Sequence, residues 1–200
     1  MDTIYKSDTK RVFLTFDDGP SPVTSKILDI LKQENVKATF FILGSNVDSR
    51  KDVVKRMYEE GHYLANHGYS HTYSKIYSSP QSVLDEYNEC NDKVKNAIEV
   101  PDYNSHLFRF PGGLAGGKYA EIKKEAKELL LQNNIVNVDW NALTGDAETN
   151  NLSVEFEMTR LTETMESKNS LVILMHDAAA KSVTADALPQ IIAKLKEEGY

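Results

Sequence analysis

The stretch Leu14-Thr15-Phe16-Asp17-Asp18-Gly19-Pro20 decides how the rest of the chain is interpreted. Its apolar residues alternate, as they do in a half-buried strand, and the Gly-Pro pair turns the chain directly after the two carboxylates. Adjacent carboxylates repel each other and resist burial, so they need compensation, for which a divalent cation is one candidate. An ordinary Asp-containing turn after a strand would use the same residues. The stretch therefore predicts a strand that ends at a charged edge, with or without a metal ion.

Length and composition indicate a globular protein of ordinary domain size. The chain has 200 residues, of which 40% are hydrophobic and 26% charged. Its net charge of -7 argues against nucleic acid and anionic membranes as partners, because both require a cationic face. The longest apolar run, residues 171–175, is too short to span a bilayer, so no membrane insertion is expected. The single Cys90 excludes an internal disulfide and, on an apolar helical stripe, is expected to be a buried hydrophobe rather than a nucleophile.

Strand and helix signals alternate along the remainder of the chain. Further strands are predicted over residues 37–43, 62–65, 105–110, 135–140 and 171–175. Helices are predicted to start at Ser21-Pro22, Asp48 or Ser49, Ser79-Pro80 and Thr184, and to cover residues 119–132 and the surroundings of Leu161; residues 141–151 are predicted to be a polar loop. This rhythm, without repeats or linkers, predicts right-handed βαβ units and a parallel sheet in one domain, residues 1–200.

Polar clusters follow the predicted strands at their C-terminal ends: Asp17-Asp18, His67 to His71, Arg109, Asp146 and His176. In a closed or nearly closed β/α barrel this edge is the catalytic face. A doubly wound open sheet would show the same periodicity. A single pocket supplied by successive strand ends favours the barrel.

His67 and His71 are four residues apart, so a helical turn would direct both imidazoles the same way, as a metal ion requires. The chain has five His, and chance alone produces such a pair fairly often. Together with Asp18, the pair would offer one carboxylate and two imidazoles. That set leaves positions open for water, which is typical of a catalytic zinc site rather than a structural one.

Four motifs resemble, in the right order, those of the polysaccharide deacetylases, the NodB homology domains of carbohydrate esterase family 4. They are residues 15–20 (TFDDGP), 67–71 (HGYSH), 109–113 (RFPGG) and 174–176 (LMH). The resemblance extends from about Arg11 to the C-terminus. It implies an α/β fold, a distorted (β/α) barrel with fewer than eight full units.

The resemblance also implies roles for the matching residues in a hydrolytic reaction. Asp17 would be the general base, held by Arg109, and His176 would be the general acid that protonates the departing amine. Without the other motifs, Arg109 would equally suit a surface ion pair and His176 the polar end of a strand. The backbone N–H of Gly112 would help to stabilise the oxyanion, because glycine permits close approach.

One divalent metal ion is the implied cofactor. Its ligands would be Asp18, His67 and His71, with zinc as the expected metal and cobalt or nickel as alternatives.

Three further residues are expected near the reacting groups. Leu174 shares a strand face with His176 and would line a pocket for the acetyl methyl, although core packing suits it as well. Trp140 would either support a sugar ring or be the largest core side chain. Asp146 is expected beside the imidazole of His176, whereas Asp177 should point away from it along an extended strand.

Two features depart from the family pattern. Where many members have a Trp-rich motif with two Asp, this chain has Leu143 at the first Asp position, keeps the second as Asp146 and has Ala147 in place of the final Trp. This puts one wall of the acetyl pocket in doubt. Members also continue from their last helix into a closing strand, whereas this sequence stops at Tyr200, so we expect a single deacetylase domain that lacks its last strand or is cut before it.

The implied function is metal-dependent removal of N-acetyl groups from N-acetylglucosamine units of a cell-wall polysaccharide, with peptidoglycan as the first candidate. Chitin oligomers and acetyl-xylan are alternative substrates, and a catalytically inactive carbohydrate-binding module is an alternative of another class. Inactive relatives usually lack the base or a ligand, and those residues are present here. We expect a monomer that acts outside the cell or in the cell wall. No signal segment opens the sequence, so a secreted protein would be a mature domain or an excised piece.

Overall fold

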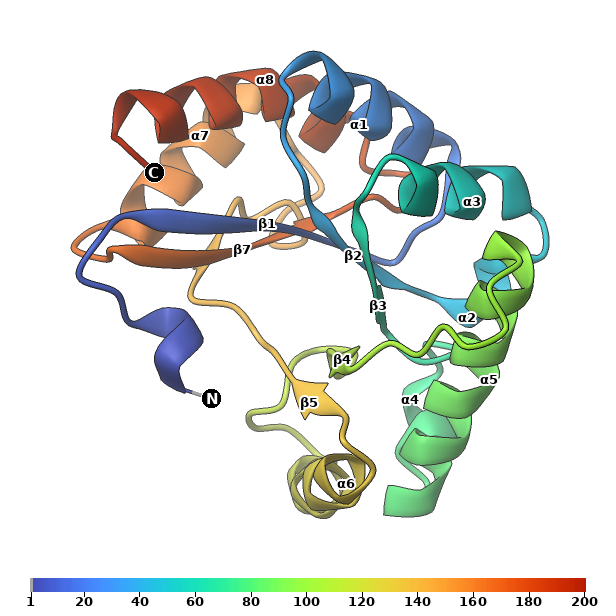
Figure 1. Ribbon diagram of the computed structural model, residues 1–200. Coiled ribbons are helices and arrows are strands. Elements are labelled where there is room, and N and C mark those ends of the chain that lie inside the picture. Colours follow the sequence, from blue (N-terminus) through green and yellow to red (C-terminus); the bar gives the residue numbers. More distant parts are fainter. Residues whose placement is uncertain (1) are drawn as a thin grey trace. The chain divides into compact units, whose positions relative to one another are not determined.

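The computed structural model describes residues 2–200 (Figure 1) and divides into two compact units. The first unit runs to Thr39 and resumes with Trp140–Tyr200, and the second comprises Phe40–Asp139. Within residues 2–200, none of the helices combines the length and apolar composition needed to cross a membrane.

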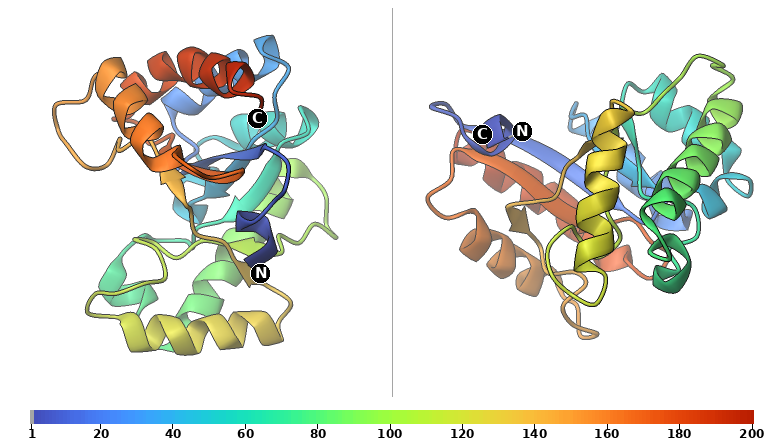
Figure 2. Two further views of the ribbon diagram at one scale, coloured as in Figure 1. Left: turned by 90° about the vertical axis from the view of Figure 1, so that its left-hand side faces the viewer. Right: turned by 90° about the horizontal axis from the view of Figure 1, so that it is seen from below.

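The first unit is built around two long parallel strands. Its elements are the 3-10 helix η1 (Asp2–Tyr5), β1 (Arg11–Asp17), α1 (Pro22–Gln33), β6 (Ala142–Leu143), α7 (Val154–Met165), β7 (Ser170–His176) and α8 (Ser182–Glu197). β7 lies between β1 and β6 and is parallel to both, and Figure 2 shows β1 and β7 running side by side. Helix α8 packs against α1 and α7 (Figure 1).

The register of β1 and β7 places two ionisable side chains at one edge of the sheet. It pairs Arg11 with Ser170 at the start and Asp17 with His176 at the end. Because the strands are parallel and end at the same level, a carboxylate and an imidazole occupy the same edge of this sheet. β7 is apolar and buried along Leu171–Met175, as expected of a parallel strand covered on both faces.

The second unit contains the shorter strands. Its elements are β2 (Thr39–Ile42), α2 (Gly44–Val47), α3 (Lys51–Glu59), β3 (Tyr63–Asn66), α4 (Tyr73–Ile76), α5 (Pro80–Ile98), β4 (Leu107–Phe108), α6 (Ala120–Gln132) and β5 (Val136–Asn137). β4 lies between β3 and β5 and is parallel to both. Helix α5 packs against α3 and α6, and a core of aromatic and aliphatic side chains includes Tyr77, Tyr87, Phe108 and Phe110.

Several predicted helix starts are confirmed, and two are wrong. Ser21 and Ser79 cap α1 and α5 through their side-chain oxygens, each with a proline at the first helical position. The start predicted at Asp48 or Ser49 is wrong, because α3 begins at Lys51 with Arg50 as its N-cap. Thr184 lies inside α8 rather than capping it, and its hydroxyl contacts buried carboxyl groups instead.

The predicted strands over 105–110 and 135–140 shorten to two residues each, and the predicted loop over 141–151 contains the short strand β6. β4 stops early because the chain soon reaches Pro111, which has no N–H to donate, and then Gly112 with φ +74°. Cys90 is buried as predicted, and burial raises the pKa of its thiol, so it is inert.

Candidate functional site

The turn after β1 presents Asp17 and Asp18 and is packed against the residue that follows His176. Asp17 is buried, and Asp18 is partly exposed with φ 77°, a left-handed conformation. A Cβ on Gly19 would lie 2.0 Å from Oδ2 of Asp177, so only glycine fits there. That oxygen accepts a hydrogen bond from the Thr24 hydroxyl (2.6 Å), and burial raises the pKa of Asp177 to about 7. The Asp177 side chain therefore supports this turn, in agreement with the expectation that it points away from the imidazole.

The structure brings Asp146 and His176 together. Nδ1 of His176 lies 2.8 Å from Oδ1 of Asp146, and the backbone N–H of His176 donates to Oδ2 (2.7 Å). Burial lowers the pKa of the imidazole, but the hydrogen bond and charge of Asp146 outweigh it, aided by Asp17 and Asp18, and raise that pKa to about 9. His176 is therefore protonated at neutral pH and can donate from Nε2.

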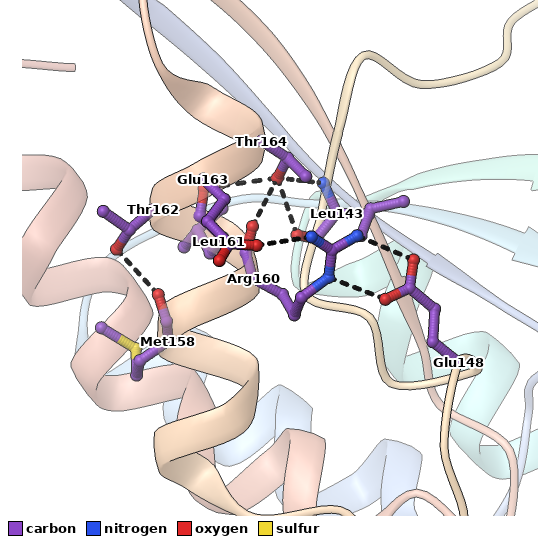
Figure 3. Close-up of polar contacts among 8 residues, drawn as sticks. All are labelled: Leu143, Glu148, Met158, Arg160, Leu161, Thr162, Glu163 and Thr164. Carbon is purple, nitrogen blue, oxygen red and sulfur yellow. Dashed lines mark hydrogen bonds and ion pairs between the residues drawn. The ribbon is translucent and has the colours of Figure 1, made fainter.

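The loop that carries Asp146 is fastened to helix α7 (Figure 3). Arg160 donates to both carboxylate oxygens of Glu148, at 2.7 Å and 3.0 Å, and these hydrogen bonds lower the pKa of Glu148. The Thr164 hydroxyl contacts the backbone N and O of Leu143 (3.1 and 2.9 Å). Both ends of this part of the loop are thus fixed to one helix, which limits the positions open to Asp146.

In the second unit, His67 and His71 lie close together at the end of β3. Their ring centroids are 5.4 Å apart. The segment does not turn helically: residues 67–72 are irregular, and Gly68 and His71 have positive φ values of 82° and 52°. Nδ1 of the buried His67 is 2.8 Å from the carbonyl oxygen of Arg109. A carbonyl can only accept, so Nδ1 carries the proton and Nε2 presents its lone pair, which fits a metal ligand.

A buried carboxylate on α5, Glu86, holds the loop between the two histidines. Its Oε2 accepts from the backbone N–H groups of Tyr69 (2.9 Å) and Ser70 (2.8 Å), and its Oε1 accepts from the Ser70 hydroxyl. We did not predict this role. The signal in the sequence was an acidic residue on the apolar face of the helix, three residues after Val83 and four before Cys90.

Replacing Glu86 with alanine is expected to weaken metal binding about 10–100-fold, because residues that orient ligands contribute that much and two partly buried N–H groups would lose their acceptor. Calorimetric titration of the metal-free protein with zinc measures the effect. The matched control is Glu89→Ala, on the exposed face of the same helix. Equal affinities for the two variants would show that Glu86 does not position the histidines.

Arg109 is fully buried, so the surface ion pair considered for it is wrong. Its Nε donates to the carbonyl of Val138 and its Nη2 to that of Asp139, both at 2.9 Å, and the guanidinium lies 4.0 Å from the ring centroid of Phe41. A cation held in this way keeps a fixed orientation. Its predicted contact with Asp17 stays a prediction.

Two buried polar side chains hold the loop that contains Gly112 through hydrogen bonds to its carbonyl groups. The Tyr77 hydroxyl donates to the carbonyl of Pro111 (2.7 Å), and Lys123 donates to that of Gly113 (2.6 Å). A Cβ on Gly112 would lie 2.6 Å from the hydroxyl oxygen of Tyr73. Lys123 belongs to the helix predicted over residues 119–132; its side chain is buried, and burial lowers the pKa of its ammonium group.

Trp140 and Leu174 belong to the first unit. Trp140 is half-buried, so the alternative that it is a core side chain is wrong. Leu174 is 9% exposed and pairs with Leu143 of β6. Contact of either residue with a substrate stays a prediction.

Comparison with known proteins supports the motif-based interpretation. A family model described as polysaccharide deacetylase matches residues 5–132. The chain belongs to the polysaccharide deacetylase family. Two curated relatives of the chain are a protein named as the putative polysaccharide deacetylase YheN of Bacillus subtilis (38% identical over 96% of this chain) and a peptidoglycan-N-acetylglucosamine deacetylase of Bacillus cereus (34% identical over 96%). The chain spans 65% and 68% of their respective lengths.

A solved structure confirms the predicted fold class. A Streptococcus mutans CE4 esterase is 35% identical and matches with a TM-score of 0.90, covering 100% of this chain and 86% of that one. The chain therefore has the predicted α/β fold of this family, a (β/α) barrel with fewer than eight full units.

Proposed function

We propose that this polysaccharide deacetylase removes N-acetyl groups from N-acetylglucosamine units of a cell-wall polysaccharide, with peptidoglycan as its substrate. The observation that carries the proposal is the register of β1 with β7, which sets Asp17 beside His176, an imidazole that Asp146 keeps protonated. Amide hydrolysis needs this combination, a base for the attacking water and an acid for the departing amine. The name of the Bacillus cereus relative supports the substrate.

The proposed cofactor is one divalent metal ion, zinc first, held by Asp18, His67 and His71. Each of the three can offer one ligand atom to a metal ion, and for His67 the proposed ligand atom is Nε2, because Nδ1 faces the carbonyl oxygen of Arg109. Bound there, the ion would polarise the acetyl carbonyl and lower the pKa of a water molecule.

Groups of the protein itself carry the remaining steps. Asp17, held by Arg109, accepts the proton of the attacking water, and His176 delivers its Nε2 proton to the nitrogen of the departing amine. The backbone N–H of Gly112 donates to the oxygen on which negative charge develops. Leu174 lines the space for the acetyl methyl and Trp140 supports a sugar ring.

The two compact units are proposed to be parts of one deacetylase domain whose partner is a glycan polymer in the cell wall, where the chain acts as a monomer. Motifs from both units enter the proposed reaction, which supports a single domain.

Acetate release from peptidoglycan, chitin oligomers and acetyl-xylan, measured side by side, tests the substrate. We expect the highest kcat/KM on peptidoglycan. A preference for acetyl-xylan would reassign the chain to ester hydrolysis, and no release from any of the three would indicate a carbohydrate-binding module.

The pH profile tests the pairing of Asp146 with His176. Asp146 raises the pKa of the imidazole, so Asp146→Asn should lower that pKa and move the basic limb of kcat/KM to lower pH. Metal content should not change. Asp177→Asn is the control, because that carboxyl faces Gly19 and Thr24, and it should leave the limb in place. A basic limb that shifts in Asp177→Asn but not in Asp146→Asn would show that the carboxylate beside His176 is wrongly assigned.

A further inference from the structure

A second buried carboxyl group, that of Glu157 on α7, lies near Asp146 and has no part in the proposed reaction. Its side chain is fully buried. The hydroxyl of Thr184, on α8, lies between the two acids, 3.1 Å from Oδ2 of Asp146 and 3.1 Å from Oε1 of Glu157. A continuous chain of hydrogen-bond contacts therefore runs from Glu157 through Thr184 and Asp146 to Nδ1 of His176.

The proton positions in this chain follow from counting donors. Thr184 has one hydroxyl proton and faces two carboxyl oxygens. Asp146 already accepts from the backbone N–H and from Nδ1 of His176, which is the behaviour of an ionised carboxylate. Thr184 therefore donates to Asp146, and its contact with Glu157 is a hydrogen bond only if Glu157 donates. If both acids were ionised, the oxygens of Thr184 and Glu157 would face each other in a buried place without a proton between them.

The surroundings of Glu157 favour the same neutral form. Burial and, next, the charge of Asp146 raise the pKa of Glu157 to about 7, against the lowering effect of the neighbouring hydroxyl groups of Thr184 and Thr144 and of the charge of Lys181. These are the charged and polar groups that face it from the Asp146 loop and from the start of α8. No cation pairs directly with its carboxyl group among the ion pairs described for residues 2–200.

We propose that Glu157 and Thr184 are positioning residues for the deacetylation reaction. In its carboxylic acid form, Glu157 donates a hydrogen bond to Thr184, Thr184 donates to Asp146, and the carboxylate fixed in this way holds the imidazole of His176. The role in catalysis rests on the proposed function, in which His176 is the general acid. The order of the hydrogen bonds does not depend on it.

The proposed order of hydrogen bonds predicts the direction in which the pKa of His176 shifts when Thr184 loses its hydroxyl. A hydrogen bond from Thr184 to Asp146 spreads the carboxylate charge and weakens its hold on the His176 proton. Removing the hydroxyl concentrates the charge and raises the pKa of His176. A merely structural loss would loosen the contact between Asp146 and His176 and lower that pKa instead, so the two explanations predict opposite shifts.

The experiment combines infrared spectroscopy with an NMR titration of the metal-free protein. At pH values between the ordinary pKa of glutamate and neutrality, the infrared spectrum of the wild type should show carbonyl bands of protonated carboxyl groups. Glu157→Gln should remove one band, and Asp177→Asn, the matched control, should remove a different one, because burial raises the pKa of that carboxyl as well. A spectrum unchanged by Glu157→Gln would overturn the proposal.

In the NMR titration, Thr184→Val should move the His176 midpoint to higher pH, while Thr184→Ser, which keeps the hydroxyl, should leave it unchanged. An unchanged or lowered midpoint in Thr184→Val would overturn the proposal. Acetate release then separates the two claims. If the midpoint rises but the basic limb of kcat/KM does not follow it, the hydrogen-bond chain stands and His176 is not the general acid.

Discussion

Replacing Asp17 with asparagine is expected to lower kcat for acetate release ~10²–10⁴-fold, the usual contribution of a general base. The amide has the same shape as the carboxylate but cannot accept the proton of the attacking water. Asp17 ends β1 and is buried directly opposite His176 in the register, and it is not one of the proposed ligands. Metal content, measured by elemental analysis, should therefore remain at the wild-type level.

Asp8→Asn is the control for this variant, because Asp8 is an exposed aspartate of the same unit. It should retain full activity. Turnover near the wild-type rate in Asp17→Asn, with metal bound, would show that Asp17 is structural and that the base lies elsewhere.

His71→Ala is expected to abolish both stoichiometric metal and activity. The proposed site has three protein ligands, and loss of one imidazole leaves one carboxylate and one imidazole for the ion. Elemental analysis of the purified variant, together with acetate release, measures the two effects. Adding a stoichiometric amount of zinc to the assay of His71→Ala should restore little activity.

The matched variant is His106→Ala, which removes an exposed histidine of the same unit whose Nδ1 contacts the carbonyl of Asn134 (3.1 Å). It should bind metal and turn over as the wild type does. A full complement of metal in His71→Ala would refute the ligand assignment.

Local signals in the sequence were sufficient for the long elements and for the residues at their ends. The alternation before Asp17 and the apolar run before His176 predicted β1 and β7, and Ser21 and Ser79 predicted the starts of α1 and α5. Each of these inferences depends on neighbours in sequence or on a regular period.

Contacts between distant segments could not be predicted in the same way. Glu86, Lys123 and Glu157 resemble ordinary solvated helix residues in the sequence, but each is buried because its partner comes from another segment. Thr184 precedes an apolar helical stripe and so resembles an N-cap, yet its hydroxyl contacts two carboxyl groups. The strands β4, β5 and β6 are too short for a period to be visible.

Metal-dependent N-deacetylation is tested most directly by titrating the metal-free protein with zinc while acetate release from peptidoglycan is measured. Without metal, we expect no acetate release above background. Activity should rise in proportion to added zinc up to a single equivalent per chain and then remain constant. Acetate release by the metal-free protein, or its absence after zinc has bound, would contradict metal-dependent deacetylation.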